Sequence, residues 1–72
     1  MALKLTRKEQ VIYDELVNNP GTLVQIGKKL NLSTATMRTY MQNISYKLGV
    51  SGRAELIIQY YTEELNRRNN DG

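Results

Sequence analysis

The sequence contains no cysteine and no histidine. Without cysteine the chain can form neither a disulfide nor a thiol nucleophile, and without histidine as well it lacks the usual ligands of a zinc site. It also has no run of about 18 apolar residues and no basic-then-apolar leader, so nothing predicts membrane insertion or secretion. We therefore expect a cytoplasmic protein with no metal and no cofactor.

Acidic residues are missing from the middle of the chain. The stretch from Leu16 to Ala54 contains neither Asp nor Glu, although the net charge of the whole chain is only +3. The cations of that stretch are Lys28, Lys29, Arg38, Lys47 and Arg53. Unopposed positive charge of this kind indicates a surface that meets phosphate. Because the carboxylates are confined to the two ends and the chain is too small for a substrate cleft, we expect no catalytic residues and no enzyme.

A chain of 72 residues is expected to form one small domain, here residues 1–72. The ordered part should cover about residues 5–66, followed by a frayed polar tail. A core of this size gives marginal stability, which self-association would improve.

Capping residues predict an all-α chain of four helices. Thr6 with Glu9, and Thr22 with Gln25, have the spacing of capping boxes, in which each side chain bonds the backbone near the other. Two helices joined by a turn as brief as the one at Asn31 should cross steeply, as in a helix-turn-helix. The expected helices cover about residues 7–18, 22–30, 34–48 and 51–66.

The third expected helix has two distinct faces. Ser33 suits its N-cap and Gly49 its left-handed C-terminal residue. An apolar stripe at helical spacing should face the core; it consists of Met37, Met41, Ile44 and Leu48. The residues expected to point away from it are Ala35, Thr39, Gln42 and Tyr46, with Arg38 and Asn43 on the flanks.

The fourth expected helix, capped by Ser51, carries more apolar residues than one face can hold. One stripe is formed by Ala54, Ile57, Ile58, Tyr61 and Leu65, and Leu56 and Tyr60 lie to its side. The excess predicts a second buried surface, against a partner subunit. The expected dimer interface is Leu56, Ile57, Tyr60 and Tyr61. The alternative is a helix that packs only on its own domain, which would bury at least Tyr61.

Several short motifs, in the right order and spacing from Leu5 to about Ile57, resemble the LuxR-type (GerE-like) helix-turn-helix family. The matches are Leu5, Thr6, Lys8 and Glu9 to LTxRE; Ile26, Leu30, Leu32 and Ser33 to IAxxLxIS; Thr36, Met37 and Arg38 to TVK; and Asn43, Ile44, Lys47, Leu48, Gly49, Val50 and Arg53 to NIxxKLGVxxR. The resemblance implies a four-helix domain whose third helix enters the major groove of DNA, and whose fourth helix often forms a homodimer contact. It also implies base reading by Arg38, Thr39 and Gln42.

The residues expected to hold the DNA backbone are Ser33, Thr34, Thr36, Lys28, Lys29, Tyr46, Lys47 and Arg53. Each has a structural alternative. Ser33 could serve only as a helix cap, and Tyr46 could lie on neighbouring side chains. Each cation could be solvated or paired within the chain with Glu9 or Glu55, and we expect about two of the four backbone cations to bind phosphate.

We therefore expect a sequence-specific, double-stranded DNA-binding transcription regulator that acts as a homodimer. The sequence departs from the family pattern at Leu23 and Val24, which stand where Asn and Lys are usual, and at Gly27 and Tyr40, where Ala and His are usual. These departures leave open an alternative of another class: a helix-turn-helix docking module that binds RNA polymerase, a sigma factor or another regulator.

Overall fold

A computed structural model describes the backbone of residues 4–70 and the side chains of residues 4–68, and it contains four α-helices in that range. Their bounds are α1 Arg7–Asn18, α2 Leu23–Leu30, α3 Thr34–Leu48 and α4 Arg53–Asn70. The all-α class and the bounds of the first three helices agree with expectation. No helix in the described part of the chain is long and apolar enough to cross a membrane.

The helix starts follow from local hydrogen bonds. Both capping boxes are formed, with the backbone N–H of Glu9 donating to Thr6 Oγ1 and that of Gln25 donating to Thr22 Oγ1. Ser33 Oγ accepts from the N–H of Thr36 at 3.1 Å. Each cap satisfies a backbone donor that has no partner inside its helix, which fixes where the helix begins.

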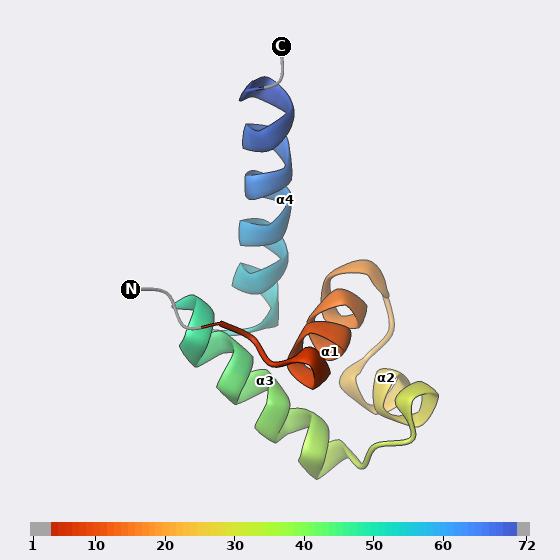
Figure 1. Cartoon of the computed structure of the whole chain (residues 1–72). Coiled ribbons are helices and arrows are strands. Elements are labelled where there is room, and N and C mark those ends of the chain that lie inside the picture. The colour runs from red at the N-terminus through yellow and green to blue at the C-terminus, as the bar shows by residue number, and fades with distance from the viewer. Residues whose placement is uncertain (1–3, 71–72) are drawn as a thin grey trace.

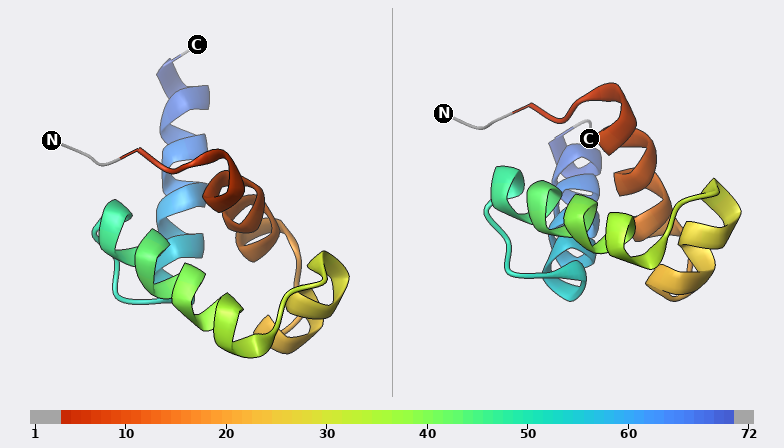
Figure 2. Two further views of the ribbon diagram at one scale, coloured as in Figure 1. Left: turned by 60° about the horizontal axis from the view of Figure 1, so that its bottom comes forward. Right: turned by 90° about the horizontal axis from the view of Figure 1, so that it is seen from below.

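In the short turn between α2 and α3, the backbone of Leu32 lies close to that of Gly27. Asn31 adopts the left-handed conformation, with φ of 61°, and the N–H of Leu32 donates to the carbonyl of Gly27 at 2.7 Å. A Cβ atom at Gly27 would lie 2.7 Å from the carbonyl oxygen of Leu32. Glycine is therefore required for the turn in this form, which brings α3 across the end of α2 as a helix-turn-helix (Figures 1 and 2).

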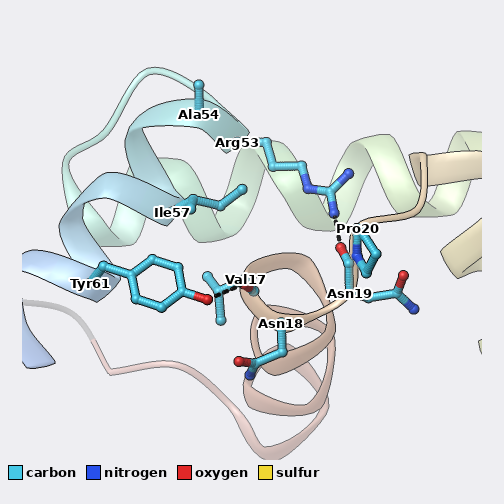
Figure 3. Close-up of a pocket in the computed structure, with 8 residues that line it drawn as sticks. All are labelled: Val17, Asn18, Asn19, Pro20, Arg53, Ala54, Ile57 and Tyr61. Carbon is cyan, nitrogen blue, oxygen red and sulfur yellow. Dashed lines mark hydrogen bonds between the residues drawn. The ribbon is translucent and has the colours of Figure 1, made fainter.

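Arg53 fastens the start of α4 to the end of α1. Its guanidinium donates to the carbonyl oxygens of Leu16, Asn19 and Gly21, at 3.1, 2.6 and 2.6 Å. Figure 3 shows this side chain reaching from α4 to the turn after α1. Leu16 lies in the last turn of α1, and Asn19 and Gly21 follow it, where intrahelical donors run out. Three of the five guanidinium N–H groups are thus bonded within the chain, and the DNA-backbone role expected of Arg53 stays a prediction.

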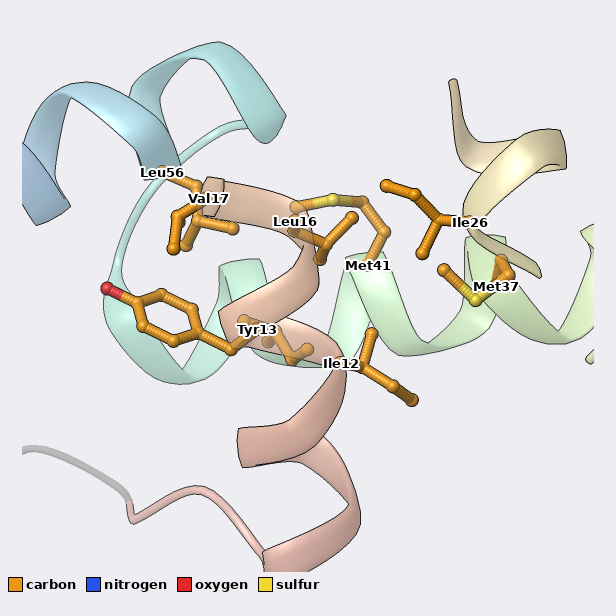
Figure 4. Close-up of a cluster of buried hydrophobic side chains, with 9 residues drawn as sticks. Ile12, Tyr13, Leu16, Val17, Ile26, Met37, Met41 and Leu56 are labelled. Atoms are coloured by element: carbon orange, nitrogen blue, oxygen red, sulfur yellow. The ribbon is translucent and has the colours of Figure 1, made fainter. Parts of the chain in front are cut away.

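The core lies where α1, α3 and α4 meet, with α2 closing one end (Figure 4). Its fully buried side chains are Ile12, Leu16, Ile26, Met37, Ile44 and Leu56. Met37, Met41 and Ile44 face this core as expected, so the opposite side of α3 faces outward. Val50 packs on the core after Gly49, which has φ of 71°.

The structure divides the residues expected at a dimer interface, because Leu56, Ile57 and Tyr60 pack on their own domain and Tyr61 is half exposed. Leu56 is fully buried, and the ring of Tyr60 packs edge to face on Tyr13 at 6.0 Å between centroids. Ile58 and Leu65 instead stay 65% and 59% exposed. Leu56 was therefore wrongly assigned to a dimer interface, because it fills the core of its own domain.

The two ends of α4 also differ from expectation. The hydroxyl of Ser51 donates to the carboxylate of Glu55, and the first helical hydrogen bond runs to the carbonyl of Gly52, so Ser51 is not the cap. The helix continues through Asn70 instead of ending near Asn66. The expected frayed tail is thus helical over most of its length, and residues 71–72 lie outside the described residues.

Candidate DNA-binding surface

The outward side of α3 is not covered by any described part of the chain. Its exposed side chains are Ala35, Thr39, Gln42 and Tyr46, opposite the buried methionines, and Arg38 and Asn43 on the flanks. Tyr46 is 80% exposed. We call this set the α3 outer face. The three residues expected to read bases, Arg38, Thr39 and Gln42, lie together on it.

The α3 outer face offers hydrogen-bonding groups with little charge. Arg38 supplies its only formal charge, and Gln42 and Asn43 supply amides that can both donate and accept. Thr39 donates its hydroxyl proton to the carbonyl of Ala35 at 3.2 Å, which leaves its methyl group and a lone pair for a ligand. A helix with such a face fits the major groove, where base edges present both donors and acceptors.

The start of α3 is held by its own side chains. Ser33 Oγ bonds Thr36 Oγ1 at 2.9 Å as well as the N–H of Thr36. Ser33 is exposed, whereas Thr34 and Thr36 are half-buried. Capping therefore accounts for Ser33 and Thr36, and their backbone-binding role stays a prediction, supported only by the free N–H groups of the first helical turn.

Two of the expected backbone cations are paired with acids inside the domain. Lys47 donates to Glu9 Oε1 at 2.5 Å, and Lys29 lies 2.9 Å from Glu15 Oε1. The pair of Lys47 with Glu9 is the alternative left open by the sequence, but Glu15 was not foreseen as a partner. No ion pair within the described side chains holds Lys28, which is exposed in the last turn of α2.

Among the described side chains Glu9 is the most buried charged residue, at 5% exposure. The ammonium of Lys47, and next the backbone N–H of Thr6, hold the pKa of its carboxyl below the usual range. The hydrogen bond from Lys29 similarly lowers the pKa of Glu15, helped by that from Asn19. Both carboxylates are therefore charged at neutral pH and neutralise a nearby cation.

Sequence reasoning missed a group of exposed cations at the start of α1: Lys4, Arg7 and Lys8. The ion pair of Glu9 with Lys47 ties this start to the C-terminal end of α3. The signal was available, since three cations within five residues precede the first acid.

Comparison with known proteins agrees with this geometry. The family described as "Bacterial regulatory proteins, luxR family" matches residues 3–60, which is most of the chain. The chain belongs to the luxR family. Members of this family are DNA-binding transcription regulators as a class and not enzymes.

One curated relative within the luxR family is the spore germination protein GerE of Bacillus subtilis (strain 168). It is 33% identical over 55 residues, which cover 76% of this chain and 73% of GerE. No solved structure matches the chain. The residues that extend beyond the family match are mainly those of the second half of α4.

Proposed function

We propose that this luxR-family chain binds double-stranded DNA sequence-specifically, with α3 as the recognition helix in the major groove. The observation that carries the proposal is the α3 outer face. It is uncovered, lies on the second helix of a helix-turn-helix, and presents Arg38, Thr39 and Gln42, whose groups suit base edges. Arg38 would pair with a guanine edge, Gln42 with adenine, and the methyl of Thr39 with thymine. Lys28 and the free N–H groups after Ser33 would hold phosphates, and Tyr46 would contact the backbone at the far end.

The test is an equilibrium titration of DNA selected from a random pool, followed by fluorescence anisotropy at fixed salt. We expect Arg38→Ala to weaken specific binding about tenfold or more, since one bidentate base contact supplies roughly 1–3 kcal/mol of discrimination. Arg67→Ala removes the same charge from the end of α4 and should leave affinity within about twofold. Equal affinity for the two variants would contradict the proposed role of α3.

We also propose that the chain acts as a homodimer through α4, which would place two recognition helices on inverted half-sites about one helical turn apart. The support is an exposed apolar stripe on α4. In this stripe Ile58 is 65% exposed, Leu65 59% and Tyr61 50%. Such a stripe on a small monomer is typical of a protein interface.

An exposed apolar residue at the start of α2 favours the second candidate function, a module that docks on RNA polymerase or another regulator. Val24 is 44% exposed, and family members usually have a polar residue there. Recovery of polymerase by the immobilised chain after nuclease treatment, lost in Val24→Lys, together with no DNA retention, would favour docking over DNA binding.

A further inference from the structure

Three exposed cations gather at the start of α1. Lys4, Arg7 and Lys8 all lie at the surface, and no ion pair within the described side chains involves them. We call these three residues the α1 basic cluster. Four of the ten cations in the chain are held by acids or by backbone carbonyls, and the cluster contains three of the other six. It is therefore the largest group of unpaired positive charge in the described part of the chain.

This position is electrostatically unfavourable for the domain on its own. The first turn of a helix carries free backbone N–H groups and the positive end of the helix dipole, which repel cations and attract anions. Glu9 is the only acid in the first turn of α1, and Lys47 already neutralises its charge. Residues that break a local rule in this way are expected where function requires them. A bound anion would remove the repulsion.

Hydrogen bonds hold the α1 basic cluster beside α3. Glu9 Oε1 accepts from the backbone N–H of Thr6 at 2.8 Å and from Lys47 Nζ at 2.5 Å. One carboxylate oxygen thus joins the chain segment that carries the cluster to the last turn of α3. Leu5 also packs against the core. Figures 1 and 2 show residues 4–6 passing along the C-terminal end of α3.

The contact with Lys47 places the cluster at one border of the α3 outer face. Lys47 lies one turn after Asn43, which belongs to the flank of that face. The start of α1 therefore meets α3 on this flank. A helix in the major groove lies between two phosphate strands, so groups along its flank are close to one of them.

We propose that the α1 basic cluster is a second phosphate site, which binds the DNA strand that borders the C-terminal end of α3. The inference rests on the proposed binding of DNA by α3 and adds contacts outside the helix-turn-helix. Within α2 and α3 only Lys28 and Arg38 are unpaired cations, so the cluster would supply most of the charge that displaces counterions. It would also fix the position of α3 along the groove without reading sequence.

The test compares two variants that lose the same charge from neighbouring residues. Arg7→Gln/Lys8→Gln changes the cluster, and Arg67→Gln/Arg68→Gln changes the end of α4. Both variants and the parent are titrated with a selected duplex and with an unrelated duplex over a salt series. The cluster variant should lower the slope of log affinity against log salt by about two per bound chain, and at about 0.1 M salt it should bind both duplexes roughly tenfold or more weakly. The α4 variant should stay within about twofold of the parent.

Thermal melting without DNA separates this role from a structural one. Because the cations repel the N-terminal end of α1, the cluster variant should melt at or slightly above the temperature of the parent. An unchanged salt slope would overturn the proposal whatever the melting temperature. A loss of affinity for the selected duplex alone would also overturn it, because the cations would then read bases.

The same titrations distinguish failure of the cluster from failure of the proposed function. If Arg38→Ala weakens specific binding while the cluster variant binds as the parent does, only the phosphate site is refuted. If the parent binds neither duplex, the proposed function is refuted together with the site.

A cleavage probe locates the cluster on DNA. The chain contains no cysteine, so Lys4→Cys can carry an iron–EDTA reagent that cuts the nearest sugar–phosphate backbone. Localised cuts are expected on one strand at the edge of each half-site. Arg68→Cys, labelled in the same way at the end of α4, is the control. Cutting by labelled Lys4→Cys that is no more localised than that of the control would overturn the proposal.

Discussion

Cations of this chain have different partners, and the difference decides what each can do. Lys47 and Arg53 look alike in the sequence, as positive residues at the end of α3 and the start of α4. The first is bound to Glu9 and the second to three backbone carbonyls. Both stabilise the arrangement of helices that presents the α3 outer face, and neither is free to bind a phosphate at full strength.

Arg53→Met should destabilise the domain by about 2–3 kcal/mol, because three carbonyls lose a charged donor while the aliphatic stem is largely kept. Chemical denaturation followed by circular dichroism measures the change. Arg67→Met, on an exposed side chain, should stay within about 0.5 kcal/mol of the parent. A parent-like Arg53→Met would mean that the carbonyls are satisfied by water.

Acid should weaken the contact of α1 with α3. Since the folded-state pKa of Glu9 is lowered, its contribution to stability is present above the unfolded-state pKa, about 4.3, and is lost as pH falls through the folded-state value. The melting temperature should therefore fall from about pH 5 to pH 2, and less steeply in Glu9→Gln. If the melting temperatures of the parent and of Glu9→Gln fell equally over this interval, Glu9 would not be the group responsible. Glu15→Gln is the matched comparison, at a more exposed ion pair.

At the level of helices, the turn between α2 and α3 should tolerate substitution least. Gly27→Ala places a Cβ against the Leu32 carbonyl and 3.0 Å from Met37 Cγ, so we expect a loss of about 1–3 kcal/mol. Gly52→Ala meets no atom within 4 Å and should cost at most about 1 kcal/mol, the usual difference between glycine and alanine at a helix N-cap. Thermal melting of the two variants compares them directly. An unchanged melting temperature for Gly27→Ala would show that α2 can move away from α3 without loss of stability.

The helices were predictable where capping residues mark their ends. Thr6, Thr22 and Ser33 each formed the expected cap, and Gly49 the expected left-handed end. The faces of α4 were not predictable, because two apolar stripes run along it and spacing does not tell which one meets the domain. Leu56 was therefore misplaced. The sequence contains no signal that marks the end of α4, which continues to Asn70.

The side of α3 on which the candidate residues lie could be predicted from helical spacing. One apolar stripe on α3 determines its opposite face, so Arg38, Thr39 and Gln42 could be grouped before any fold was known. The partners of the cations could not be predicted in the same way, since the contacts of Lys47 with Glu9 and of Lys29 with Glu15 depend on how three helices pack.

For the whole molecule, the paired cations imply a modest dependence of DNA affinity on salt. Lys28→Ala should reduce the slope of log affinity against log salt by about one per bound subunit, as expected for a lost phosphate contact. Lys29→Ala should change it less, because its charge is already offset by Glu15. Anisotropy titrations over a salt series measure both slopes, and a larger effect of Lys29 would contradict the ranking.

The hydrogen bonds of Arg53 have a further consequence for operator choice. In the proposed pair, the separation of the two recognition helices depends on the angle between α3 and α4, and Arg53 anchors α4 to the loop that follows α1. A single side chain remote from the groove would thus fix the angle of α4. Altering it would change the spacing between half-sites that the protein accepts, while the bases read within each half-site would stay the same.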